Sequence, residues 1–157
     1  MTNLPDELSR LILSKCGQTD LAALRRTCKT MRGAVGPLRF TVRDYLDTPR
    51  TVRWAARHLG MPLNAATFAA AARTSNLSVL KTLRSLKCGH DSRVCTNLAR
   101  RDHVTGLRWA RDEGFAWNFL CCSAAVDAES ARTVRWLGNP AVECPCGGTY
   151  HEVGVAR

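Results

Sequence analysis

Apolar residues near the amino terminus recur at intervals of three and four, which is the spacing of one face of an α-helix. Leu8, Leu11 and Ile12 form this series. The carboxylates of Asp6 and Glu7 come just before it and suit the positive end of a helix macrodipole. The pattern predicts a short amphipathic helix at the start of the chain.

A second amphipathic series follows a predicted helix stop at Gly17. Thr19 or Asp20 can cap this second helix. Its apolar positions are Leu21, Leu24 and Cys28. We therefore expect a compact helical module over residues 1–40.

The order of residues in this module resembles the F-box, a short helical motif. The resemblance is carried by a Leu-Pro start, an Asp-Leu return and a Cys-Lys pair, within the set Leu4, Pro5, Glu7, Leu8, Ile12, Asp20, Leu21, Leu24, Cys28 and Lys29. Thr27 and Met31 stand where the motif commonly has valine and tryptophan. The plainer interpretation is a capped helical hairpin without a dedicated partner.

The F-box resemblance implies a partner, the Skp-type adaptor of a cullin-RING ubiquitin ligase. The residues that it assigns to adaptor binding are Leu4, Pro5, Leu8, Ile12, Leu21, Leu24, Cys28 and Met31.

The rest of the chain is periodic. Asn64, Asp91 and Asn118 recur every 27 residues, and each precedes a helix-like run as an N-cap does. The same interval relates Phe68, Cys95 and Cys122, then Ala70, Asn97 and Ala124, then Leu77, Val104 and Ala131. A second recurring element begins at Val52, Leu80, Leu107 and Val134. Its first interval is 28, which one extra residue near Leu59-Gly60 explains.

Each unit is predicted to hold two short helices, the first of them opened by Pro49. Tight turns are expected at 60–62, 88–89 and 114–115 on one side, and at 75–76, 102–103 and 129–130 on the other. One helix pair cannot bury its apolar side alone, so the units should stack into a solenoid. Thr96 and Asn97 interrupt an alanine-rich layer, and we expect them to need local hydrogen bonds.

The repeats resemble the ankyrin-like repeats that giant viruses of amoebae carry, often after an F-box. The matching residues are Val52-Arg53-Trp54, Leu107-Arg108-Trp109, Cys88-Gly89-His90-Asp91 and Phe115-Ala116-Trp117-Asn118. The Thr-Pro-Leu-His signature of standard ankyrin repeats is absent, which leaves the β-hairpin fingers of that family without support.

The composition fits an intracellular protein, cytoplasmic or nuclear. Three of its eight cysteines, Cys28, Cys95 and Cys122, fall on core positions of predicted helices, which indicates reduced thiols. No apolar stretch is long enough to span a membrane. The net charge of +10, from 23 basic and 13 acidic residues, favours nucleic acid or an acidic protein as partner without choosing between them.

Residues suited to catalysis or metal binding are not grouped in the sequence. The four histidines lie in turns or near helix ends of different units: His58, His90, His103 and His151. Cys144 and Cys146, with His151, resemble part of a zinc site to which Cys121-Cys122 could add ligands, but the spacing matches no usual zinc pattern. A turn made by proline and glycine is the favoured interpretation, and we expect no cofactor, no metal and no enzymatic activity.

Two sets of residues are candidates for target binding. Basic residues recur on the first helix of each unit, at Arg53, Lys81, Arg108 and Arg135, joined one turn later by Arg57, Arg84 and Arg111. The unit tips vary on a constant frame, at Leu63, His90 and Trp117, and such positions usually carry recognition. A solvated helix face is the plainer interpretation of the basic set.

We therefore predict an all-α protein with an F-box-like module at 1–40, a connector at 41–48, an ankyrin-like solenoid of about three helix pairs at 49–146, and an irregular tail at 147–157. The tail either folds back as a cap or ends a shortened array. The predicted function is the substrate-recognition subunit of an SCF-type ubiquitin ligase. The alternatives are a basic repeat module that binds nucleic acid or an acidic protein, and a decoy that binds the adaptor but no target.

Overall fold

A computed structural model of the chain describes residues 17, 20, 23, 41–144, 146 and 147. The chain forms two compact units, Met1–Tyr45 and Leu46–Arg157. In the first unit, the described residues include the 3-10 helix η1 (Val42–Tyr45). The predicted adaptor-binding residues lie outside the described residues: Leu4, Pro5, Leu8, Ile12, Leu21, Leu24, Cys28 and Met31.

Asp20 is helical, so it lies inside the predicted second helix of the first unit rather than before it. Its carboxylate accepts the N–H of Gly17 at 3.3 Å. An acidic residue in the first turn that reaches back in this way satisfies one of the amides that a helix N-terminus leaves without a partner.

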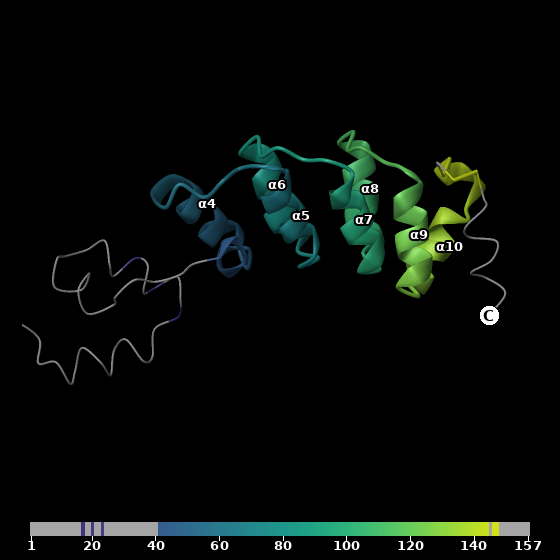
Figure 1. Ribbon diagram of the computed structural model, residues 1–157. Helices are drawn as coiled ribbons and strands as arrows, with labels where there is room; N and C mark the ends of the chain where they lie inside the picture. Colours follow the sequence, from purple (N-terminus) through teal and green to yellow (C-terminus); the bar gives the residue numbers. More distant parts are fainter. Residues whose placement is uncertain (1–16, 18–19, 21–22, 24–40, 145, 148–157) are drawn as a thin grey trace, which may run out of the picture. The chain divides into compact units, whose positions relative to one another are not determined.

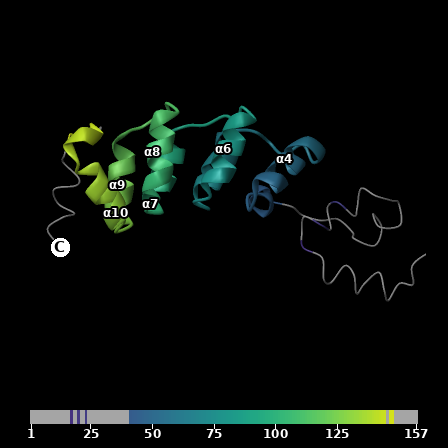
Figure 2. The same ribbon diagram turned by 180° about the vertical axis from the view of Figure 1, so that it is seen from behind.

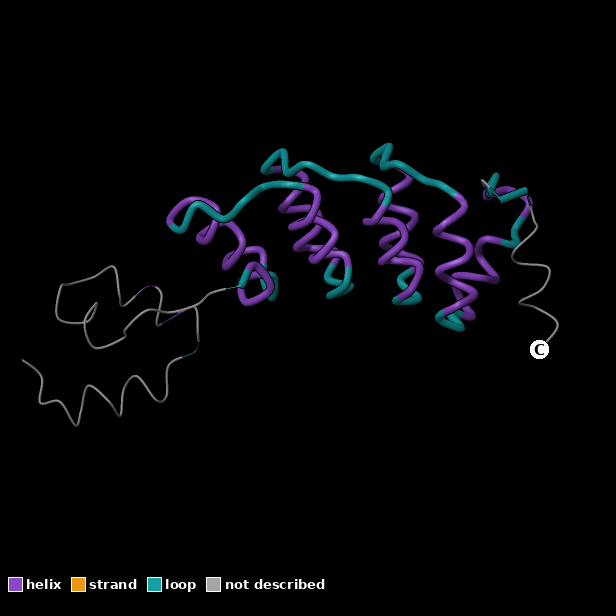
Figure 3. Tube along the Cα trace, in the orientation of Figure 1, coloured by secondary structure: helices purple, strands orange, loops and turns teal. Residues whose placement is uncertain are grey.

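The second unit is a row of helices (Figure 1; seen from behind in Figure 2). In chain order they are α4 (Pro49–His58), α5 (Ala65–Ala72), α6 (Leu77–Ser85), α7 (Arg93–Arg100), α8 (Val104–Asp112), α9 (Phe119–Asp127), α10 (Ala131–Leu137) and the 3-10 helix η2 (Pro140–Val142). The described part of the chain contains no strand (Figure 3), which confirms the all-α class. No described helix is long and apolar enough to cross a lipid bilayer.

The helices stand in hairpins: α5 contacts α6, α7 contacts α8, and α9 contacts α10 (Figure 1). Short turns close these hairpins, whereas longer loops lead from one hairpin to the next, drawn in teal in Figure 3. The links near 60–62, 88–89 and 114–115 are therefore parts of connecting loops rather than tight turns. A helix that ends in a left-handed residue leaves the chain free to continue in an extended conformation.

The 27-residue period is repeated in the backbone. Helices α6, α8 and α10 begin at Leu77, Val104 and Ala131. Residues with a left-handed φ recur at the same interval after the first helices, at Gly60, Lys87 and Gly114 (64°, 54° and 73°), and after the second helices, at Ser75, Asp102 and Glu129 (58°, 52° and 52°). Because glycine, lysine, serine, aspartate and glutamate share these two columns, the common conformation does not come from glycine alone and is consistent with a helical repeat.

The longer first interval is also present. Cys88 and Phe115 each donate their N–H to a carbonyl five residues back, whereas Met61 donates to Ala55, six residues back, at 3.2 Å. Because Gly60 is again in register with Lys87, the additional residue lies between Ala55 and Gly60, where α4 has ten residues and α6 has nine. This is next to the expected position near Leu59-Gly60. Pro49 opens that helix as predicted.

Two of the three predicted caps are confirmed. Asn64 and Asn118 accept helix amides at 3.0 and 3.1 Å at the start of α5 and α9. Helix α7 differs, since it begins at Arg93 with Ser92 at the N-cap position and no side-chain cap bond from Ser92. The carboxylate of Asp91, one residue before the N-cap, still accepts the N–H of Arg93 at 3.0 Å. It therefore gives a partner to one of the first amides of α7, which have none within the helix.

Helix α7 packs between α5 and α9 and brings together the predicted core column. Phe68 and Cys95 are fully buried and Cys122 is 1% exposed. Asn97 donates its Nδ2 to the carbonyl of Ala69 in α5 at 2.8 Å, and Thr96 donates its Oγ1 to the carbonyl of Ser92 at 3.0 Å. Both polar residues in the alanine layer thus have the hydrogen bonds that their burial requires.

Helix α10 receives its cap from the preceding hairpin. Its own N-cap residue, Ser130, makes no side-chain cap bond. The carboxylate of Asp102, in the α7–α8 turn, accepts the N–H of Thr133 at 2.7 Å. Arg132 pairs with the same carboxylate at 3.5 Å and donates to the carbonyl of Asp102 at 3.1 Å.

Candidate interaction site

The predicted basic column lies on the first-helix layer. Arg53, Lys81, Arg108 and Arg135 belong to α4, α6, α8 and α10, and all four are exposed. Within the described part of the chain none of them forms an ion pair. Four cations without an ion-pair partner, at intervals of 28, 27 and 27 residues, produce a positive potential along this layer.

The second arginine column is not part of a free stripe. Arg84 pairs with Glu113 at 3.1 Å and lies over the ring of Phe115, 5.4 Å from its centroid. Arg111 donates to the carbonyl of Val142 and lies 5.3 Å from the ring centroid of Trp117. These two arginines link successive units, because their guanidinium groups find a carboxylate, a carbonyl and aromatic faces in the next unit. Of the three arginines in this second column, Arg57, Arg84 and Arg111, only Arg57 is exposed.

His90 is packed inside the fold rather than presented at a tip. Its ring stacks on Phe115 at 4.1 Å between centroids, and its Nε2 lies 3.1 Å from Nη1 of Arg84. Phe68 meets Phe115 edge-on at 5.2 Å. This aromatic cluster fills the space between hairpins, and His90 is part of that packing.

The other two predicted tip residues, Trp117 and Leu63, differ from each other in exposure. Trp117 is half-buried, and its ring meets Trp136 edge-on at 5.8 Å. Leu63 is 37% exposed. Of the three predicted tip residues, Leu63 is therefore the one whose side chain is most available to a partner.

Two exposed apolar residues were missed by the sequence analysis. Phe119 and Leu120, in the first turn of α9, are 50% and 46% exposed. The equivalent residues are Ala65 and Ala66 in α5, and Ser92 and Arg93 at the start of α7. A large apolar residue in a column that is otherwise small or polar was the signal that could have found them.

Three thiols come together at the carboxyl-terminal end of the array. The Sγ atoms of Cys122 and Cys144 are 2.8 Å apart, and those of Cys144 and Cys146 are 3.1 Å apart. All three Sγ atoms lie within 4.8 Å of one another. Burial, reinforced by the neighbouring thiols, raises the pKa of Cys122. His151, which the sequence analysis placed with this group, lies outside the described residues.

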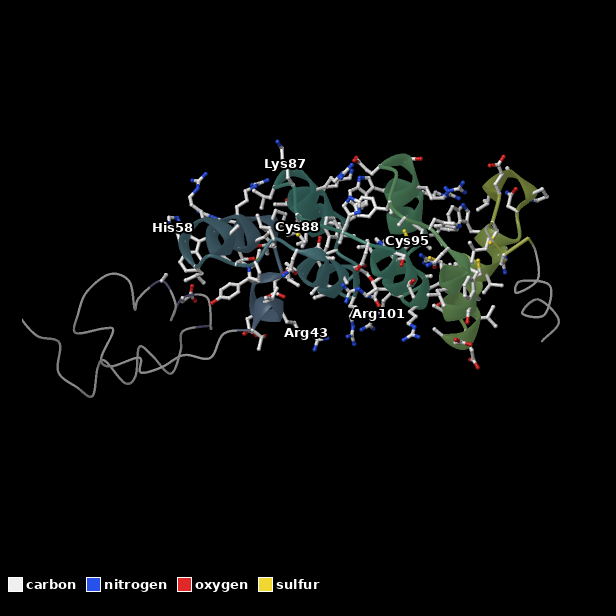
Figure 4. The ribbon with its side chains drawn as sticks, turned by 45° about the horizontal axis from the view of Figure 1, so that its top comes forward. Arg43, His58, Lys87, Cys88, Cys95 and Arg101 are labelled. Carbon is white, nitrogen blue, oxygen red and sulfur yellow. The ribbon has the colours of Figure 1, made fainter. Side chains whose placement is uncertain are left out.

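Cys121 belongs to a different contact. Its interaction with the Cys95 thiol lowers the pKa of Cys121, and the same interaction with burial raises the pKa of Cys95. Thr96 Oγ1 also lies 3.8 Å from Cys121 Sγ. Cys88 and Cys95, labelled in Figure 4, lie among the helices, and burial raises the pKa of Cys88 to about 11.

His103 occupies the N-cap position of α8. Its ring covers Gly106, where a Cβ atom would lie 2.2 Å from Nδ1. That Nδ1 is buried and has no hydrogen-bond partner among the described residues. Burial, followed by the charge of Arg132, lowers the pKa of His103.

Comparison with known proteins bears on the first unit. No curated protein and no solved structure matches the chain. The family model of the F-box domain matches residues 1–43, a span that contains every predicted adaptor-binding residue. This match supports an F-box protein, and the helical packing of the second unit is consistent with a repeat array.

Proposed function

We propose that this chain is the substrate-recognition subunit of an SCF-type ubiquitin ligase. The observation that carries the proposal is the F-box domain at residues 1–43, because an F-box suggests a role as an adaptor in such a ligase. F-box proteins are typically non-enzymatic. The chain would contribute proximity alone, by holding a target near a ubiquitin-charged enzyme.

The F-box domain implies a Skp-type adaptor as the partner of the first unit. We propose that the apolar faces of the two amino-terminal helices fill the adaptor's groove, through the residues Leu4, Pro5, Leu8, Ile12, Leu21, Leu24, Cys28 and Met31. Burial of apolar side chains would drive this contact, so its affinity should depend little on salt.

The second unit would hold the target protein. Arg53, Lys81, Arg108 and Arg135 offer positive charge, and Leu63 offers exposed apolar surface. We add Phe119 and Leu120 to this surface because both are exposed. His90 and Trp117 remain in the proposal as residues that shape the surface from within. The target would therefore combine acidic and apolar side chains.

The proposed ligase determines where in the cell the chain would act. The chain would act in the cytoplasm or nucleus. The resemblance of its repeats to those of giant viruses of amoebae suggests that the ligase is the one of an infected host, which the viral chain would redirect to a new target.

The test is co-purification with an amoebal Skp-type adaptor at moderate salt. A Leu8→Asp, Ile12→Asp double variant should lose the adaptor while circular dichroism shows that it stays folded. The matched control replaces two exposed apolar residues of the repeats in the same way, by Leu63→Asp and Leu120→Asp, and should retain the adaptor. Failure of the wild type to bind, or equal binding by all three proteins, would overturn the proposal.

A second candidate is a basic repeat module that binds nucleic acid or an acidic protein without recruiting a ligase. The exposure of all four column residues favours it. For duplex DNA, each lost phosphate contact should reduce the slope of log affinity against log salt by about 0.9. The variant reverses the column, with Arg53→Glu, Lys81→Glu, Arg108→Glu and Arg135→Glu. The control reverses four exposed arginines outside it, with Arg50→Glu, Arg73→Glu, Arg100→Glu and Arg101→Glu.

A further inference from the structure

The three clustered thiols come from two separate segments. Cys122 lies in α9, and Cys144 and Cys146 follow η2, so that 22 residues separate the first two thiols in sequence. Cys122 is 1% exposed, whereas Cys144 and Cys146 are half-buried. The cluster therefore has one side in the core and another side that solvent can reach.

The segment after α10 is held so that its thiols face α9. Val142 is buried, and its carbonyl accepts a hydrogen bond from Arg111 of α8. Glu143, directly before Cys144, adopts a left-handed conformation (φ 42°). The N–H of Gly147 then donates to the carbonyl of Cys144 at 3.1 Å and closes a turn that contains Cys146. These contacts preorganise the two half-buried thiols.

Three thiolates on one side of a shared centre are the donor set of a soft closed-shell cation. Tetrahedral zinc–sulfur bonds of about 2.3 Å place the sulfur atoms about 3.8 Å apart. The observed separations of 2.8 and 3.1 Å would have to widen by about 1.0 and about 0.7 Å. A disulfide requires an S–S distance near 2.05 Å, which is also shorter than either separation.

We propose that Cys122, Cys144 and Cys146 form a three-thiolate binding site for a thiophilic metal ion such as Zn²⁺. The ion fastens the segment after α10 to α9 and so caps the end of the repeat array, with its fourth position open to water. Each thiol releases its proton when its sulfur binds the ion. Repeat arrays need a cap at their ends, and the inference concerns that role alone, so it does not depend on adaptor binding.

This site replaces the interpretation of the sequence as a turn without a metal. The Cys-x-Cys pair with Cys121-Cys122 did not match a usual zinc spacing. In the structure only Cys122 of that neighbouring pair joins the group, because Cys121, one residue earlier on the helix, contacts Cys95 and Thr96.

The test uses the full chain, purified under reducing conditions, stripped with a chelator, and reloaded with Zn²⁺ or Cd²⁺. We expect one tightly held equivalent of metal by mass spectrometry, a thiolate-to-cadmium charge-transfer band, and a melting temperature that rises with zinc. Cys146→Ser and Cys122→Ser should lose all three signals. The matched control is Cys88→Ser, which removes a buried thiol outside the cluster and should keep them.

Cys146→Ser is the decisive variant because its side chain is half-buried and its replacement is conservative. Its fold is checked by circular dichroism. Three results would overturn the proposal: no metal retained by the folded, reduced wild type; equal retention by the wild type and Cys146→Ser; or a Cys122–Cys144 disulfide that forms in place of metal uptake under the same reducing conditions.

Discussion

The repeat pattern and the hydrogen bond of Asn97 predict opposite effects of Asn97→Ala on the stability of the protein. Asn97 occupies the column that holds alanine in the neighbouring units, at Ala70 and Ala124. By analogy with its neighbours, replacement of Asn97 by alanine should stabilise the protein. Alanine is also the better helix former, by about 0.5 kcal/mol.

The structure predicts the opposite sign. Asn97 donates to the carbonyl of Ala69 at 2.8 Å, and Ala69 is only 6% exposed. This carbonyl lies in the last turn of α5, where intrahelical partners are lacking. Leaving a buried carbonyl without a partner costs about 1–3 kcal/mol. After the gain in helix propensity, Asn97→Ala should lower the free energy of unfolding by about 0.5–2.5 kcal/mol.

Urea unfolding followed by circular dichroism measures this difference as a lower midpoint at an unchanged slope. Thr105→Ala, on the exposed face of α8, is the control for helix propensity alone and should raise stability by a few tenths of a kcal/mol. Asn97→Asp keeps the side-chain shape but replaces the donor by a carboxylate, so it should cost at least as much as Asn97→Ala. If Asn97→Ala matches or exceeds the wild type in stability, the hydrogen bond does not stabilise the array and the reasoning fails.

Two further predictions concern a turn and a histidine. Lys87 has a φ of 54° where the equivalent residue Gly114 is a glycine, so Lys87→Gly should stabilise the protein by about 1 kcal/mol and Gly114→Ala should destabilise it by a similar amount, both read from urea midpoints. Because burial lowers the pKa of His103, the unfolded state binds more protons just below the ordinary histidine pKa. The contribution of this group to stability is therefore complete above about pH 6.5 and is lost as the pH falls through the lowered value. His103→Gln should flatten this part of the profile of urea midpoint against pH, and an unchanged profile would contradict it.

The repeat itself was open to prediction because its signals are local. Asn64 and Asn118 are caps whose side chains act on amides two or three residues away, and Pro49 fixes a helix start by its own ring. Lys87 shows the limit of such signals, since the backbone takes a left-handed conformation there without the glycine that would announce it. In this case the period, and not the residue, identifies the turn.

The features that the sequence did not reveal depend on contacts between distant residues. His90 belongs to a cluster with Phe115, and Arg84 to an ion pair with Glu113, although each was assigned to the surface from its position within one unit. The thiol cluster joins α9 to the segment after η2, 22 residues away in sequence. No spacing rule within one segment contains that information.

The cap that Asp102 gives to α10 affects how this array can be divided. An exposed N-terminus with no side-chain partner would fray, so α10 needs the preceding turn to define its first residue. Its folding is thus coupled to that of the α7–α8 hairpin, in addition to the packing between them. A deletion or exchange of repeats that separates Asp102 from Thr133 removes this coupling even where every helix is kept whole. Recombined arrays should therefore keep these two residues together, with the break placed in a connecting loop upstream of α7.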